Sequence, residues 1–227
     1  MRSQHDNGPP NTRAVETTLT SVGSSQSWPS EMTLSALLRE RTRRAHAAVE
    51  VSFSLETRLA SFAAYGALLI ALRDFYLGLE IRLRAVAGWD RLSPAIDVDS
   101  RCRAVLLNHD LQRMGLSVQS ASAEASLPLP QLDSMGQALG CLYVLEGSVL
   151  GGRIVSHRAC LALGNQLPVT FFSSENRKNV MGDWRSFQAS LDNFGYDHEQ
   201  VVVDAVVDGA LETFAAMGLW LEKISDE

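Results

Sequence analysis

The sequence predicts an all-α protein with six to eight helices around one core. Three observations lead to this fold class. From residue 31 onward, apolar residues recur at helical spacing almost everywhere. No segment shows convincing strand alternation, and even the valines at 201–203 lie within a helical period. The composition does not shift inside residues 31–227 and shows no repeat period, so we expect a single domain over these residues.

Six helices are expected, each marked by a capping, bending or terminating residue. The first three are a helix capped by Thr33 or Ser35 that runs to about Val49, a helix from Leu59 to Val86 that bends near Gly66 or Gly78, and a helix from Asp99 to Met114 ended by Gly115. A small-residue loop is expected over residues 120–126. The fourth helix is Leu132–Leu163, which stops at Gly164. The fifth runs from Glu175 to about Phe194 and is capped by Ser174. The sixth is His198–Lys223, capped by Asp197.

Residues 1–30 differ from the rest of the chain in composition. They are rich in Ser, Thr, Asn, Gln, Gly and Pro and have hardly a bulky apolar residue before Trp28. Such a segment cannot bury enough apolar surface to offset the entropy lost on ordering. We expect a disordered N-terminal arm.

Composition and charge narrow the function classes. The formal net charge is −6, whereas nucleic-acid binders usually carry a basic total. The three cysteines, Cys102, Cys141 and Cys160, form no CxxC pair and are typical of reduced thiols. No stretch approaches about 18 consecutive apolar residues, and no leader-like segment begins the chain. We expect a soluble cytoplasmic protein that binds neither nucleic acid nor membrane.

One apolar helical segment carries five glycines, at positions 136, 140, 147, 151 and 152. Each interior glycine costs a helix about 0.8–1 kcal/mol relative to alanine, so another interaction must offset that cost. Gly140, Val144, Gly147 and Gly151 share one stripe that has almost no side chains. Such a stripe lets either a second helix, the commoner case, or a flat ligand lie against the backbone.

His46 lies on the apolar face of the first predicted helix, where a histidine can be a core residue or a metal ligand. Glu50 follows it by four residues and can orient the ring, as carboxylates do for metal-bound histidines. Arg39 precedes it by seven residues, about 10 Å along the same face. A flat ligand with a central metal and anionic groups at its rim fits this set, and haem is such a ligand.

Two motifs resemble one protein family. LRERTRRAHAAVE (residues 38–50) resembles the proximal helix of haem oxygenases, and LGCLYVLEGSVLGG (residues 139–152) resembles their distal helix. The residues Tyr-Val-Leu-Glu-Gly-Ser of the second motif are most similar to those of bacterial haem oxygenases associated with bacteriophytochromes. Later segments resemble the same group, including Phe171-Phe172, Trp184-Arg185 and the region around Phe214 and Trp220. The resemblance covers about residues 31–224.

The resemblance implies a haem oxygenase-like bundle in which haem lies between a proximal helix and a kinked distal helix. His46 would be the proximal ligand of the haem iron, with Thr42 and Glu50 around it. The distal helix would rest on the haem and leave room for O₂ at its glycines: Gly147, Gly151 and Gly152.

Other roles also follow from the resemblance. Arg39 and Arg185 stand where the family often places cations for the haem propionates, Phe214 would form part of the pocket wall, and Tyr143 would bind haem or serve packing. Many members carry an aspartate directly after the first distal glycine, but this chain has Ser148. A hydroxyl can hold a water but supplies no carboxylate, so proton delivery would use Ser148 with water or another group.

The expected activity is O₂-dependent cleavage of haem, as both cofactor and substrate, to biliverdin, CO and Fe²⁺. The biliverdin would supply a bacteriophytochrome. No glycine-rich nucleotide loop follows a strand, so electrons would come from an external ferredoxin or other small reductase, docked near Arg41 and Arg44. Two alternatives are a haem carrier or sensor without turnover on the same fold, and a helical interaction module in which His46 is a core residue.

Overall fold

The predicted all-α, single-domain fold is confirmed by the computed structural model. The structure describes residues 32–116, 127–174 and 177–224, and no residue in these ranges is in a β-strand. Its longer helices are α1 (Leu34–Phe53), α3 (Phe62–Ala85), α5 (Ala104–Arg113), α6 (Met135–Leu163), α8 (Val180–Asp197) and α9 (Gln200–Lys223). Short turns of helix lie between them: α2 (Leu55–Arg58), the 3₁₀ turn Trp89–Arg91, α4 (Val98–Arg101) and α7 (Thr170–Ser173). The expected arm at 1–30 and loop at 120–126 lie outside the described residues.

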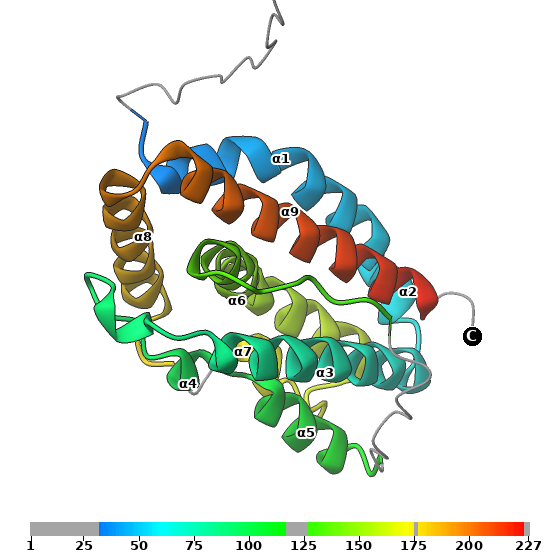
Figure 1. Ribbon diagram of the computed structural model, residues 1–227. Helices are drawn as coiled ribbons and strands as arrows, with labels where there is room; N and C mark the ends of the chain where they lie inside the picture. The colour runs from blue at the N-terminus through cyan, green and yellow to red at the C-terminus, as the bar shows by residue number, and fades with distance from the viewer. Residues whose placement is uncertain (1–31, 117–126, 175–176, 225–227) are drawn as a thin grey trace, which may run out of the picture.

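Helix α6 lies in the middle of the bundle (Figure 1). It packs most extensively along α9, and α9 packs in turn along α1. Helices α3 and α5 pack together on the side of α6 away from α1, while α8 contacts α1 and α6 at one end. Leu38, Leu69, Phe75, Leu139 and Val206 are fully buried between these helices. Burial of such side chains is the main favourable term that holds the fold together.

The α6–α9 contact explains part of the glycine stripe. A Cβ atom on Gly140 would lie 2.6 Å from the Ala210 backbone nitrogen, and one on Gly136 would lie 3.0 Å from the Val202 carbonyl oxygen. From the other side, a Cβ atom on Gly209 would lie 2.7 Å from Gln137 Cα. The two backbones therefore approach more closely than any side chain allows, and these glycines serve helix packing.

We expect Gly140→Ala to lower the free energy of unfolding by about 2–3 kcal/mol, because its methyl group would overlap backbone atoms of α9 that cannot rotate away. Gly218→Ala is the matched control on α9, where a Cβ atom meets nothing within 4 Å. There the substitution should gain up to about 1 kcal/mol, since alanine is the better helix former. Urea unfolding measures both. Equal stability of the two variants would contradict the close contact.

The predicted helix from Asp99 to Met114 is wrong as a single element, because the chain breaks at residues 102–103 into α4 and α5. The cause is Glu80 on α3. Its Oε1 accepts hydrogen bonds from the backbone N–H groups of Arg103 (2.5 Å) and Ala104 (2.8 Å). These amides lie at the start of α5, where no helical carbonyl is available to them.

Two predicted helix caps are also wrong. Ser174 ends α7 in a left-handed conformation, with φ of 55°, and α8 begins later, after Asn179, whose side chain accepts from Gly182 N–H at 3.0 Å. Asp197 is the last residue of α8 and does not cap α9. Smaller shifts occur at two other starts, since Ser61 caps α3 and Ser134 caps α6.

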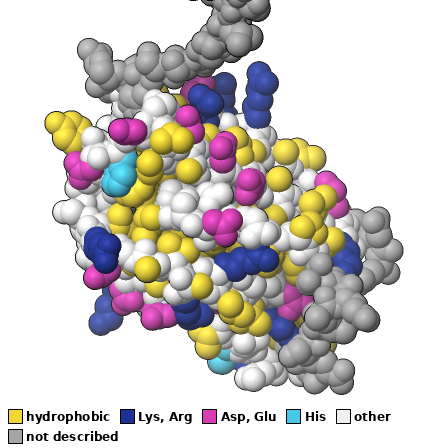
Figure 2. Space-filling view, in the orientation of Figure 1, with side chains coloured by type: hydrophobic (Ala, Val, Ile, Leu, Met, Phe, Trp, Pro, Cys, Tyr) yellow, Lys and Arg dark blue, Asp and Glu magenta, His cyan; other side chains and the backbone are white. Residues whose placement is uncertain are grey.

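Helices α3 and α6 are each long and apolar enough to cross a membrane by length and composition alone. In each helix, half or more of the most apolar window is buried inside the bundle, at 50% and 56%. Burial of this kind is what core helices of a soluble protein show. On the face drawn in Figure 2, acidic and basic side chains are interspersed, and the described residues form no broad basic area there.

Candidate functional site

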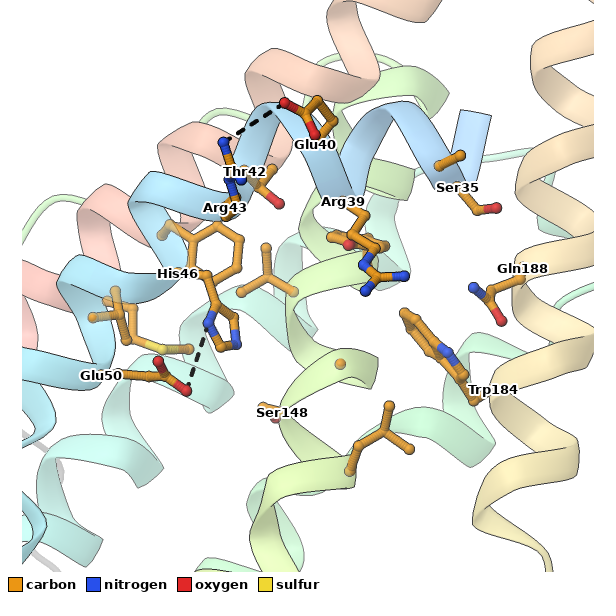
Figure 3. Close-up of a pocket in the computed structure, with 18 residues that line it drawn as sticks. Ser35, Arg39, Glu40, Thr42, Arg43, His46, Glu50, Ser148, Trp184 and Gln188 are labelled. Carbon is orange, nitrogen blue, oxygen red and sulfur yellow. Dashed lines mark ion pairs between the residues drawn. The ribbon is translucent and has the colours of Figure 1, made fainter. Parts of the chain in front are cut away.

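A cavity of about 980 Å³ opens between α1, α6, α8 and α9. Eight of the residues singled out in the sequence line it: Arg39, Thr42, His46, Glu50, Tyr143, Gly147, Ser148 and Phe214. Figure 3 shows how the labelled side chains enter it from α1, α6 and α8. Residues that are a hundred or more positions apart in the sequence thus meet at one site of ligand size.

His46 enters the cavity from α1 and keeps more than half of its side chain exposed (Figure 3). Its Nδ1 atom lies 3.7 Å from Glu50 Oε1, and its ring packs edge-on against Phe214 at 5.7 Å between centroids. The Phe214 contact fixes the ring, and Glu50 beside Nδ1 leaves Nε2 for a ligand. The interpretation of His46 as a buried core residue is therefore wrong.

No three His, Cys, Asp or Glu side chains gather to hold a metal ion in the described part of the chain. A metal at His46 must therefore bring most of its ligands with it. A metal chelated by a flat macrocycle satisfies this condition, whereas a bare Zn²⁺ ion would need more protein ligands.

The α1 wall is fixed by polar contacts at its start. Thr33 caps the helix, and Asp192 of α8 accepts from the Ser35 N–H at 2.8 Å and from its hydroxyl at 3.1 Å. Thr42 is buried, and its hydroxyl donates to the Leu38 carbonyl at 2.7 Å. Thr42 therefore serves helix α1 and the packing of the wall.

One end of the cavity is polar and cationic. Arg39 points into it towards Trp184 and Gln188 of α8 (Figure 3). Tyr143 packs against Trp184 at 5.6 Å between ring centroids, and burial raises the pKa of its phenol, with Thr42 and Arg39 opposing the rise. An anionic group of a ligand would find its counter-charge at this end.

The distal glycines do not all face this cavity. Gly147 lines it, and a Cβ atom there would meet nothing within 4 Å. Gly151 is also open but lies outside the lining, and a Cβ atom on Gly152 would lie 2.5 Å from the Phe172 carbonyl oxygen. Arg185 is exposed on α8 and does not line the cavity either. The structure therefore does not bring Gly151, Gly152 or Arg185 to the site. Gly152 faces Phe172 of α7, whereas Gly151 and Arg185 are exposed.

Ser148 has a partner that sequence reasoning missed. The Tyr76 hydroxyl of α3 lies 2.7 Å from Ser148 Oγ, and Ser148 in turn donates to the Leu145 carbonyl at 2.7 Å. Tyr76 is almost fully buried behind the cavity wall. Its position in an apolar helix is typical of any core aromatic residue, so the sequence held no signal for this contact.

Glu146, next to Gly147, is a second residue that the sequence did not reveal. It is buried and accepts from Arg101 at 2.8 Å and from both terminal nitrogens of Arg177 at 2.8 and 2.9 Å. These bonds tie the Gly147–Ser148 segment of α6 to α4 and to the chain after α7. Moving any one of these groups away would leave a buried charge without its partner, which is costly. The Gly147–Ser148 segment is therefore held firmly.

The family model described as Heme oxygenase matches residues 32–223. The chain belongs to the heme oxygenase family. The family and its fold imply haem degradation, with haem bound as substrate by an oxidoreductase. No curated protein sequence matches the chain significantly.

Two solved structures share the fold of this heme oxygenase family member. A heme oxygenase from Neisseria meningitidis, in NO- and CO-bound forms, is 20% identical, with a TM-score of 0.67 over 85% of this chain and 92% of that chain. A heme oxygenase from Leptospira interrogans is 19% identical, with a TM-score of 0.66 over 85% of this chain and 100% of that chain. At such identities the likeness concerns the fold.

Proposed function

We propose that this protein binds haem between α1 and α6 and cleaves it, with O₂ and external electrons, to biliverdin, CO and Fe²⁺. One observation carries the proposal: His46, the one histidine among the described residues that line the cavity, enters a space of about 980 Å³ that is also lined by Gly147. The residues present fit haem, because one histidine, apolar walls and a cation at one end match an iron, a macrocycle and its carboxylates.

Bound haem would supply the iron at which O₂ is activated. The protein's own residues would bind the haem, orient it and supply the proton. His46 would ligate through Nε2, with Glu50 holding the Nδ1 side of the ring. Gly147 would leave space for the macrocycle, and the Ser148 hydroxyl, when turned from the Leu145 carbonyl, would offer the cavity a polar hydrogen in place of the aspartate that many family members carry.

Arg39 should steer the haem by pairing with a propionate. We expect Arg39→Ala to weaken hemin affinity by less than about fivefold, because such a pair is solvent-screened. It should also change the ratio of biliverdin isomers, since rotation of haem in its plane presents another meso carbon. Arg185→Ala is the matched control and should keep both quantities, because Arg185 does not line the cavity. Chromatography of the products measures the ratio, and an unchanged ratio in Arg39→Ala would remove Arg39 from the propionate site.

The electron donor is proposed to be a ferredoxin or another small reductase. Arg41 and Arg44 are exposed on α1, the helix that carries His46, and do not line the cavity. They offer a basic surface to an acidic electron-donor protein. The similarity of the distal motif to bacteriophytochrome-associated enzymes supports a cytoplasmic role in which the biliverdin becomes a chromophore.

Titration with hemin, followed by ascorbate, tests this function. A Soret band that saturates at one hemin per chain supports the haem site, and its absence would favour a helical interaction module in which the glycines serve packing and His46 binds no metal. On addition of ascorbate in air, loss of the Soret band with growth of biliverdin absorption is expected. An unchanged spectrum would instead identify a haem carrier or sensor.

A further inference from the structure

Two hydroxyl groups meet behind the cavity wall, and only one of them reaches the cavity. Ser148 lines it, whereas Tyr76 is almost fully buried and is not among the lining residues. Their oxygens are 2.7 Å apart. Ser148 has a single proton and donates it to the Leu145 carbonyl at 2.7 Å, so in this arrangement Tyr76 is the donor and Ser148 the acceptor.

We propose that Tyr76 positions and polarises the Ser148 hydroxyl as a hydrogen-bond donor towards a ligand bound in the cavity. Rotation about the Ser148 Cβ–Oγ bond turns its proton away from the Leu145 carbonyl and leaves Oγ in place, so Tyr76 continues to donate to it. A hydroxyl that accepts one hydrogen bond donates a stronger one, because hydrogen bonds in a chain polarise one another. No covalent bond changes. Tyr76 is therefore a positioning residue that acts through Ser148.

The surroundings of Tyr76 keep its phenol in the donating form. Burial raises the pKa of Tyr76, while the Arg103 guanidinium and the bond to Ser148 lower it and Glu80 and Glu146 raise it. The balance lies above the ordinary value, so the phenol stays protonated at neutral pH. Its ring is held edge-on by Phe171 at 5.0 Å between centroids.

Arg103 fixes this arrangement from behind. Its guanidinium lies 4.2 Å over the Phe171 ring and donates to the Phe171 carbonyl. Its backbone N–H is in turn held by Glu80 of the same helix as Tyr76. Among the described residues, the Tyr76 hydroxyl has one hydrogen-bond partner, the Ser148 hydroxyl, and it serves the cavity through that bond.

The inference rests on the proposed haem site, and fluoride binding to the ferric hemin complex tests it without turnover. Fluoride is a small anion that accepts hydrogen bonds, so its affinity reports donors on the distal side. We expect Tyr76→Phe to weaken fluoride binding about three- to tenfold, the worth of one hydrogen bond, and Ser148→Ala to weaken it at least as much. Imidazole affinity should stay unchanged in both variants, because that ligand needs no such donor.

The double variant Tyr76→Phe/Ser148→Ala decides whether Tyr76 acts through Ser148. No loss beyond that of Ser148→Ala is expected, since coupled residues are not additive. Ser148→Thr, which keeps the hydroxyl, should restore the fluoride affinity. Wild-type fluoride affinity in Tyr76→Phe, or fully additive losses, would overturn the inference. Failure to bind hemin at all would instead overturn the proposed function.

A second measurement does not depend on whether Tyr76→Phe folds. Incorporating 3-fluorotyrosine makes every phenol a stronger donor without removing one. Fluoride affinity of the hemin complex should rise in the otherwise wild-type chain and stay constant in Ser148→Ala. A rise of equal size in Ser148→Ala would show that another tyrosine, such as Tyr143 in the cavity lining, causes it, and would overturn the role of Tyr76.

Discussion

His46→Ala should abolish normal haem ligation and leave no measurable turnover. No second histidine lines the cavity, so the iron loses its protein ligand and no described histidine replaces it. The ferric Soret band and the electron paramagnetic resonance spectrum of the hemin complex measure the loss. Added imidazole should restore the ligand field, because removal of the side chain leaves a space beside Phe214 that the free ring can occupy.

His109→Ala is the matched control. His109 lies on α5 with about half of its side chain exposed and does not line the cavity, so its removal should leave the spectrum and the turnover unchanged. A His46→Ala protein with a wild-type spectrum and full turnover would place the iron elsewhere.

The second large effect is expected at Gly147. Gly147→Leu should block productive hemin binding and turnover, because a branched side chain would enter the open space where haem or O₂ would lie. Helix content should be preserved, since leucine is a better helix former than glycine. Circular dichroism checks the fold, and hemin titration with ascorbate checks the site.

Gly151→Leu carries the same substitution one turn further along α6. Sequence reasoning gave Gly151 the same role as Gly147, but the structure leaves it open to solvent and outside the cavity lining. We expect it to bind and degrade hemin at nearly the wild-type level. Normal turnover by Gly147→Leu would contradict the placement of haem or O₂ beside Gly147.

The helical architecture and much of the site could be predicted from the sequence because both depend on local spacing. Apolar periodicity located the six longer helices. His46 and Glu50 lie one turn apart on one helix, so their proximity follows from helix geometry alone. The glycine stripe likewise indicated that a backbone or a ligand comes close to α6.

The remaining features depend on contacts between helices that are distant in sequence. Gly147 and Gly152 look alike in the sequence, yet one faces the cavity and the other the backbone of Phe172. The break between α4 and α5 requires Glu80, a residue of α3. The Tyr76–Ser148 pair joins side chains 72 positions apart, and no periodicity reports such a pairing.

Aerobic turnover of the hemin complex, with ascorbate as the electron donor and catalase to remove free peroxide, tests the central claim most directly. The products are separated by chromatography, and CO is trapped by ferrous myoglobin. The account predicts that the Soret band disappears while biliverdin and one equivalent of CO per haem form, and that His46→Ala forms neither. Persistence of the Soret band, or its bleaching without biliverdin and CO, would contradict the account.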